Sequence, residues 1–228
     1  MPIDPASLLL WADDDLLVVN KPAGLPTLVD GYHPEAPYLA GLLREAYAPL
    51  WVVHRLDRET SGVMVFARTA QAHRELNRQF EQHQAAKRYH ALASGAPAWE
   101  TKQCSLRLRP DGDRRHRTVI DPRRGKPAET ELRVLERFPG MCLLEAAPRT
   151  GRTHQIRAHL AALQLPLLGD ALYGGPDPAE TGLPIARLAL HAVQLSLLHP
   201  NSGLAQQFEA PYPPDFSACL AALRQPRE

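Results

Sequence analysis

Residues 51–67 read WVVHRLDRETSGVMVFA, in which the polar run HRLDRETSG (54–62) lies between the apolar runs WVV and VMVFA. Short apolar runs of β-branched and aromatic residues bounded by turn-forming residues are typical of buried strands. The polar run is therefore predicted to be a loop between two strands, fixed by the sheet and open to water. Such a loop suits catalysis, although an ordinary solvated turn would show the same pattern.

The rest of the chain contains more strands than helices. Strand patterns occur at 16–24, 87–94, 141–147 and 188–200, and 101–138 resembles a hairpin turned at 121–129. Helical patterns occur at 39–48, 70–84, 154–164 and 214–223. Because the strands do not alternate with the helices, we predict an α+β fold with a largely antiparallel central sheet flanked by helices.

Two of these helices have more specific features. In the helix at 70–84 the apolar spacing places four residues toward the core: Ala72, Leu76, Phe80 and His83. For the helix at 154–164, Thr153 is the predicted N-cap, while Ile156, Leu160 and Leu163 form the core stripe. Arg157 follows Ile156 and is rotated about 100° from that stripe, so it can point sideways into a cleft.

Composition limits the class of protein. The chain has 228 residues and a net charge of +1, and its apolar N-terminal run LLLW is too short for a signal peptide or a membrane span. Its three cysteines are far apart, which suits a reducing compartment and no paired zinc site: Cys104, Cys142 and Cys219. We therefore expect a cytoplasmic protein with no membrane and no metal partner.

A basic stretch interrupts this near-neutral charge. Nine Lys or Arg residues but only three Asp residues lie between Lys102 and Lys126. Such a stretch can be a solvated face, but it is also what an arm that contacts phosphate would look like. The candidate arm residues are Arg114, Arg115 and Arg117.

Three polar islands occur at predicted strand or helix ends: HRLDRETSG, KRY (87–89) and RTGRTHQIR (149–157). Together they offer the Asp57 carboxylate, the Tyr89 phenol and several guanidinium groups. This set suits nucleophilic catalysis on a phosphate-bearing substrate.

Three other functions can be compared with this set of residues. A glycoside hydrolase normally needs two carboxylates at a defined separation, whereas arginines dominate the islands. A metal site from His54, Asp57, His154 and His159 is disfavoured, because the last two are five residues apart on a helix and nearby arginines would repel a cation. An RNA-binding module without catalysis stays open, although it would not require Asp57.

Several long motifs resemble those of the RluA-type RNA pseudouridine synthases. DDDLLVVNKPAGL, HRLDRETSGVMVFART, KRYHAL and RTGRTHQIRAHLAALQLPLLGDALYG, followed by LALHA and HP, occur in the family's order over about 13–215. The resemblance implies a single catalytic domain over 1–228 with an active-site cleft across the sheet. One departure is at the front, where some relatives carry an extra RNA-binding domain and we expect no separate N-terminal RNA-binding domain in this chain.

The implied activity is that of an isomerase that acts on specific uridines in structured RNA, which is large-subunit ribosomal RNA, transfer RNA or both. The bond from ribose C1′ to uracil N1 breaks, the base turns, and C1′ is joined to C5, with no cofactor or metal. By resemblance, the catalytic aspartate is Asp57, the stacking tyrosine is Tyr89 and the site arginine is Arg157. We read Arg157 as the ion-pair partner that keeps Asp57 ionised and aimed. Whether the carboxylate attacks the sugar or the uracil ring stays open.

Further residues complete the predicted site. The target uridine must leave its stack, and Arg55 is our candidate to fill the gap or to hold a phosphate. Gly62 is expected to shape the turn with a positive φ. The remaining predicted substrate-binding residues are His54, Arg149, Arg152, Thr153, Gln155 and Leu190. His54 and His154 also fit hydrogen-bonded structural roles better than catalytic ones. We expect a monomer in which loop 54–62 and the helix near His154 converge on one cleft.

Overall fold

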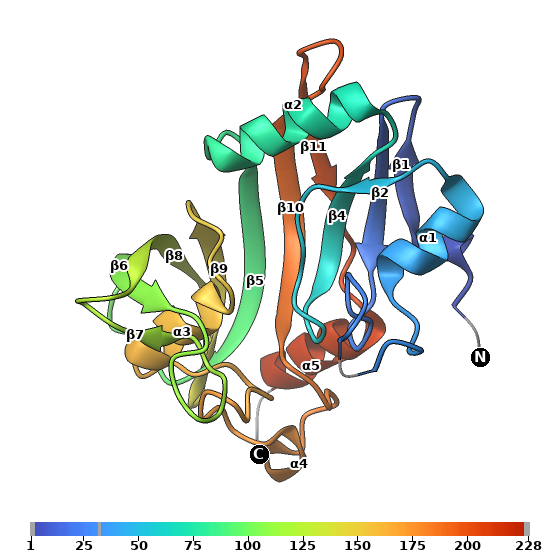
Figure 1. The fold of residues 1–228 in the computed structure, drawn as a ribbon. Helices are drawn as coiled ribbons and strands as arrows, with labels where there is room; N and C mark the ends of the chain where they lie inside the picture. Colours follow the sequence, from blue (N-terminus) through green and yellow to red (C-terminus); the bar gives the residue numbers. More distant parts are fainter. Residues whose placement is uncertain (1–2, 32, 226–228) are drawn as a thin grey trace. The chain divides into compact units, whose positions relative to one another are not determined.

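The computed structural model describes residues 3–31 and 33–225, which fold into two compact units (Figure 1). Unit 1 comprises Met1–Lys87 and Ala192–Pro211, and unit 2 comprises Arg88–His191 and Tyr212–Glu228. Both units combine mainly antiparallel strands with helices, so the predicted α+β class is confirmed. The predicted cleft and the single domain over 1–228 stay predictions.

The sheet of unit 1 is built around β4 (Ser61–Ala67), which is buried along its whole length. Its antiparallel neighbours are β2 (Leu16–Lys21) and the short β3 (Trp51–Val52). A hairpin adds β1 (Leu9–Ala12), and residues 194–198 of β10 (Leu190–Leu198) pair with β11 (Ala205–Glu209). A short 3-10 helix, η1 (Pro5–Leu8), precedes β1. The polar run thus connects β3 to β4, which confirms the predicted strand–loop–strand.

Two helices belong to unit 1: α1 (Leu39–Tyr47) and α2 (Ala70–Glu81). In α2, Ala72 and Leu76 are buried as predicted, but His83 lies beyond the helix end and is exposed. Gln79 is buried instead, because its side-chain amide bonds to both backbone polar groups of Leu198, at the end of β10. Its Nε2 donates to the Leu198 carbonyl, and its Oε1 accepts from the Leu198 N–H, both at 2.9 Å.

The sheet of unit 2 has the order β5, β9, β8, β6, β7, and each strand is antiparallel to the next. Their bounds are β5 (Ala86–Ser94, from Arg88 in unit 2), β6 (Thr101–Arg109), β7 (Val119–Ile120), β8 (Lys126–Phe138) and β9 (Met141–Pro148). The predicted hairpin is confirmed as β6 and β8. Its connection is longer than predicted, because residues 110–125 fold back and add β7 to the edge.

Helices cover both faces of this sheet. On one face, α3 (Gln155–Ala162) buries Ile156 and Leu160 against strand residues such as Leu144. On the other face, α5 (Pro214–Arg224) buries Phe216 against residues such as Leu143. Leu143 and Leu144 point to opposite faces because successive strand residues alternate. A single turn of helix, α4 (Pro178–Thr181), lies in the connection between α3 and β10.

Candidate active site

The loop that carries Asp57 is held from its N-terminal side by Thr27. The buried Thr27 hydroxyl donates to the carbonyl oxygen of Leu56 at 2.9 Å and accepts from the Leu56 N–H at 3.3 Å. After Asp57, the Thr60 N–H donates to the Asp57 carbonyl at 3.1 Å and closes a turn. The backbone that leads into Asp57 is therefore fixed by a side chain far away in sequence.

On the other side of Asp57, a fully buried lysine holds the backbone. The Lys21 ammonium donates to the carbonyl oxygens of Pro22, Leu25 and Arg58, at 2.8, 2.7 and 3.0 Å. Gly24 reinforces this contact, because its N–H also donates to the Arg58 carbonyl, at 2.9 Å. The NKPAG motif by itself gives no role to Lys21. The available signal was a lysine at the end of an apolar strand, directly before a turn.

His54 is a structural residue at the start of this loop. Its Nε2 accepts a hydrogen bond of 3.1 Å from the Val65 N–H, and its ring stacks on Phe80 with 4.7 Å between centroids. Burial, with a smaller contribution from Lys87, lowers the pKa of His54 to about 3. The imidazole is therefore neutral and helps to fix β4. Arg55, in contrast, is exposed and makes no side-chain hydrogen bond with any described residue.

Gly62 ends the loop in a conformation that other residues avoid. Its φ is +121°, as the turn reading anticipated, and a Cβ atom at this position would lie 2.2 Å from the carbonyl oxygen of Ala192. The absence of a side chain thus allows the backbone of β10 to approach the start of β4 within unit 1.

In unit 2, Arg157 is held by Asp170. The guanidinium Nε and Nη2 donate to the two carboxylate oxygens, each at 2.7 Å, and the side chains of Arg157 and Asp170 are only 12% and 1% exposed. The guanidinium carbon also lies 4.9 Å from the ring centre of Tyr173. Asp170 was missed because the sequence places it in a loop, with nothing that marks it as the partner of an arginine thirteen positions earlier.

Tyr173 links Arg157 to a distant loop. Its hydroxyl accepts from the Thr118 N–H at 2.9 Å and donates to the Thr118 carbonyl at 3.1 Å. Burial raises the pKa of Tyr173, which keeps the hydroxyl protonated. The same oxygen lies 3.2 Å from His154 Nδ1, so His154 is hydrogen-bonded as expected.

The start of α3 differs from its prediction. The N-cap is His154, with a φ of +53°, and the exposed Thr153 is not the cap. The side-chain amide of Gln155 holds the start of α3 instead. Its Oε1 accepts from the Arg152 N–H at 3.0 Å, and its Nε2 donates to the Glu129 carbonyl at 2.8 Å. Because Gln155 is buried and bonded on both sides, its side chain positions α3 against β8.

The other predicted site residues of unit 2 lie in varied surroundings. Leu190 is buried, and Tyr89 is half-buried on β5 opposite Ala146. Arg152 donates from Nε to the Pro127 carbonyl at 3.1 Å, and the exposed Arg149 lies 3.6 Å from Glu131. Unit 2 thus holds Tyr89, Arg157 and Leu190, whereas Asp57, His54 and Arg55 belong to unit 1. The pairing of Asp57 with Arg157 stays a prediction.

Residues 15–162, which include Asp57, Tyr89 and Arg157, match the family model described as RNA pseudouridylate synthase. The chain belongs to this family. A curated relative, the dual-specificity RNA pseudouridine synthase RluA of Escherichia coli, is 37% identical over 92% of this chain and 95% of its own length. The resemblance to RluA-type synthases is therefore confirmed.

Other relatives agree on the family and on the fold. Ribosomal large subunit pseudouridine synthase D of Nitrosomonas europaea is 39% identical over 95% of this chain, which spans 65% of that protein, just under two thirds. The solved structure of human RNA pseudouridylate synthase domain containing 4 has 27% identity and a TM-score of 0.80, covering 96% of this chain and 95% of that one. The pseudouridine-synthase-type fold is thus shown.

The three histidines considered as metal ligands, His54, His154 and His159, each have a hydrogen-bond partner in the protein. His159 is buried, its Nδ1 lies 2.9 Å from the Thr130 hydroxyl, and burial lowers its pKa to about 4. Across residues 3–31 and 33–225, no three His, Cys, Asp or Glu side chains form a group that could hold a metal ion. In the same residues, no helix has the length and apolar character needed to cross a membrane.

The candidate arm residues are not equivalent. Arg117 pairs with Asp113 at 2.7 Å and donates to the Leu172 carbonyl at 3.4 Å, so it stabilises its own loop. Arg115 donates to the Ala171 carbonyl at 3.2 Å. Arg114 is exposed and makes no side-chain bond with other described residues.

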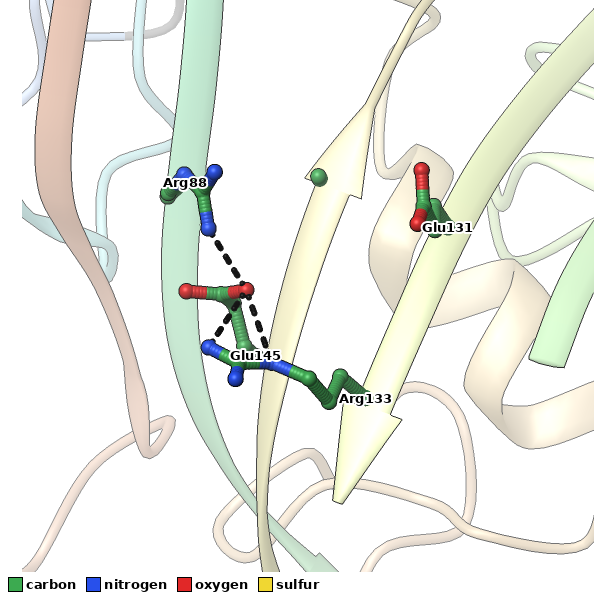
Figure 2. Close-up of a pocket in the computed structure, with 5 residues that line it drawn as sticks. Arg88, Glu131, Arg133 and Glu145 are labelled. Atoms are coloured by element: carbon green, nitrogen blue, oxygen red, sulfur yellow. Dashed lines mark hydrogen bonds and ion pairs between the residues drawn. The ribbon is translucent and has the colours of Figure 1, made fainter. Parts of the chain in front are cut away.

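A charged hollow of about 150 Å³ lies on the sheet of unit 2, on β5, β9 and β8 (Figure 2). Glu145 stands between Arg88 and Arg133 and accepts hydrogen bonds from both, at 2.9 and 3.2 Å. Arg88 directly precedes Tyr89 on β5, so the two side chains point to opposite faces of the strand. Because these charges pair with one another, we read the hollow as an ion-pair network.

Proposed function

We propose that this chain is an RNA pseudouridine synthase in which Asp57 is the nucleophile. One observation carries the proposal: both backbone neighbours of Asp57 are locked, Leu56 by Thr27 and Arg58 by Lys21. A nucleophile held in place before substrate binds needs little reorganisation during the reaction. Membership of the pseudouridylate synthase family supplies the reaction class.

The reaction is an isomerisation that needs no external reagent. The Asp57 carboxylate forms a covalent adduct with the flipped uridine, and the bond between C1′ and N1 breaks. The base then turns so that C1′ joins C5. The proton on C5 is lost, N1 gains a proton, and the carboxylate is released unchanged.

Other residues receive supporting roles in this proposal. Asp170 holds Arg157. We propose that Arg157 is the cation that favours the ionised form of Asp57 when the site is assembled. Tyr89 stacks on the uracil, and the uncommitted Arg55 fills the space that the flipped base leaves. Gln155 and His54 act through the backbone that they fix.

The substrate is proposed from the names of relatives. Several relatives are named for the ribosomal large subunit, and one is named as a dual-specificity enzyme. We therefore propose large-subunit ribosomal RNA as the first candidate and transfer RNA as the second. We further propose that the chain works in the cytoplasm as a monomer, without cofactor or metal.

The hydrolase alternative needs a second carboxylate, and Asp170, the partner of Arg157, is one to consider. Both of its oxygens are engaged by Arg157, and its side chain is 1% exposed. Asp170 therefore does not offer a carboxylate that can reach water and a sugar.

Product analysis tests the proposal. The chain is incubated with RNA carrying labelled uridine, the RNA is digested, and the nucleosides are separated. The expected product is the carbon-linked isomer, whereas free uracil would identify a hydrolase and unchanged uridine a binding protein. Comparing carbon-linked uridines across the transcriptome with and without the gene then identifies the RNA.

The role of Asp57 has its own variant. Asp57→Asn should abolish product formation while it preserves the fold and most of the RNA affinity, because affinity comes mainly from phosphate contacts. Asp14→Asn, at an exposed position with no side-chain partner among the described residues, is the control. Turnover of Asp57→Asn within tenfold of wild type would exclude Asp57 as the nucleophile.

A further inference from the structure

The basic side chains between Lys102 and Lys126 fall into two groups: some bond within unit 2, and the others make no side-chain bond in the described chain. Arg109, Arg115 and Arg117 bond to other parts of unit 2. The other six are exposed and form no side-chain hydrogen bond or ion pair within the described chain: Lys102, Arg107, Arg114, Arg123, Arg124 and Lys126.

Four of these six gather where β6, β7 and β8 meet. Arg123 and Arg124 lie in the turn between β7 and β8, Lys126 begins β8, and Arg107 lies on β6 opposite Pro127. We call Arg107, Arg123, Arg124 and Lys126 the hairpin end.

Asp121 makes the hairpin end rigid. Its Oδ1 accepts from the backbone N–H groups of Arg123 and Arg124, at 3.1 and 2.8 Å, and its Oδ2 accepts from Arg109 Nε at 2.8 Å. The carboxylate is thereby used to shape the turn. The side-chain charges of Arg123 and Arg124 are left without a carboxylate partner in the described structure.

Close packing brings Arg107 to the same turn. The Asp121 N–H donates to the Arg107 carbonyl at 2.9 Å. A Cβ atom on Gly125 would lie 2.7 Å from the carbonyl carbon of Arg107 and 2.8 Å from the Leu108 nitrogen. The turn can lie this close to β6 only because residue 125 is a glycine.

Arg152 extends the basic surface toward α3. Its Nε donates to the Pro127 carbonyl, directly across the strand pair from Arg107. Arg152 also leads into the helix that carries Arg157. A ligand bound along the hairpin end would thus lie on a path to the start of α3.

We propose that the hairpin end binds the phosphate backbone of the RNA substrate, outside the nucleotide that reacts. The inference rests on the proposed function, because it takes RNA as the ligand. Four cations on the hairpin end suit a polymer that brings a phosphate with every nucleotide. A protein partner would have to place several carboxylates at matching positions. Because Arg115 and Arg117 have partners in unit 2, we assign the phosphate contacts to the hairpin end in their place.

Salt dependence of binding tests this surface. Wild type and the triple variant Arg123→Gln, Arg124→Gln, Lys126→Gln are titrated with a transcript of large-subunit ribosomal RNA at several salt concentrations. Each phosphate contact contributes about 0.7 to 0.9 units to the slope of log affinity against log salt. The triple variant should therefore flatten the slope by about 2 to 3 units. Its kcat at saturating RNA should stay within about twofold of wild type, because phosphate contacts do not touch the reacting atoms.

Two further triple variants serve as comparisons. Lys102→Gln, Arg74→Gln and Arg224→Gln remove the same charge away from the hairpin end and should leave the slope nearly unchanged. Arg114→Gln, Arg115→Gln and Arg117→Gln should flatten it by about one unit, because only Arg114 is uncommitted.

The outcomes separate the two proposals. An unchanged slope in the hairpin-end variant, or equal flattening in the Lys102, Arg74 and Arg224 control, would overturn the inference while wild-type pseudouridine formation leaves the proposed function standing. If the slope flattens as expected but wild type forms no pseudouridine, the RNA surface is supported and the proposed function fails.

Discussion

The Nζ atom of Lys21 lies 3.0 Å from the carbonyl oxygen of Arg58, the residue that follows Asp57. The lysine is fully buried at the end of β2, and its two other acceptors are backbone carbonyls of the adjoining turn. A buried ammonium without such acceptors would be costly. Lys21 thus connects a strand, a turn and the loop of Asp57.

Lys21→Met should damage both stability and activity. Methionine fills a similar volume but removes the ammonium donor of the Pro22 and Leu25 carbonyls and leaves the Arg58 carbonyl with the Gly24 N–H alone, which should lower the free energy of unfolding by about 3 kcal/mol. A displaced Asp57 should lower kcat by about 100-fold. Urea unfolding and single-turnover assays measure the two effects. Lys102→Met, at an exposed position, should change neither. Full activity in Lys21→Met would show that the loop does not depend on the lysine.

Gly62→Ala should destabilise unit 1 strongly. The substitution combines a φ of +121° with a Cβ that would lie 2.2 Å from the Ala192 carbonyl oxygen. Backbone strain and overpacking together should cost about 2 to 5 kcal/mol in urea unfolding. Gly140→Ala is the matched control, because φ there is +72° and nothing lies within 4 Å of the added carbon. Equal losses in the two variants would mean that the close approach of Ala192 does not matter.

The elements around Asp57 could be predicted because apolar runs mark both strands. The same holds for α5, predicted at 214–223 and found at Pro214–Arg224. Lys21 and Thr27 could not be assigned, since their partners are backbone carbonyl and amide groups that every residue carries. The sequence shows which residue types are present, but not which backbone atoms meet them.

The start of α3 shows a second limit. A threonine before a helix favours capping, yet His154 is the cap, because the Gln155 amide already bonds to the Arg152 N–H and to the Glu129 carbonyl. Contacts between distant segments decide this position, and local propensity does not. Similarly, Asp170 becomes visible as a partner of Arg157 only once the fold is known.

His54 should make stability depend on pH. Burial lowers its pKa from 6.5 to about 3, so between these values the unfolded chain binds a proton that the native protein does not. The contribution of His54 to stability is therefore fully present above pH 6.5 and is lost as pH falls toward 3. Protonation would also remove the acceptor for the Val65 N–H.

His54→Gln keeps an acceptor for Val65 but does not titrate. Between pH 6 and pH 4, wild type should lose up to about 1.4 kcal/mol per pH unit more than the variant. Urea midpoints measured at half-unit intervals give the difference. His90 and His159 are present in both proteins, so their contributions to the difference cancel. Parallel pH profiles would show that His54 is not buried in its neutral form.

Asp170→Asn should affect both the free energy of unfolding and kcat, because Asp170 positions Arg157. The amide is isosteric with the carboxylate but removes one acceptor and the negative charge, so a buried guanidinium loses its bidentate partner. The free energy of unfolding should fall by about 3 kcal/mol. If Arg157 acts on the reacting uridine through Asp57, kcat should fall by about 100-fold while KM for RNA stays nearly constant.

Unit 2 contains a matched pair for this experiment. Arg187 also bonds its carboxylate partner, Asp215, through Nε and Nη2, at 2.7 and 2.9 Å. Asp215→Asn should therefore lower stability, but less than Asp170→Asn, because the Asp215 side chain is 35% exposed. Its kcat, measured well below the melting temperature, should be that of wild type. A similar fall of kcat in both variants would mean that Asp170 acts only through stability, and that Arg157 needs no aiming for the reaction.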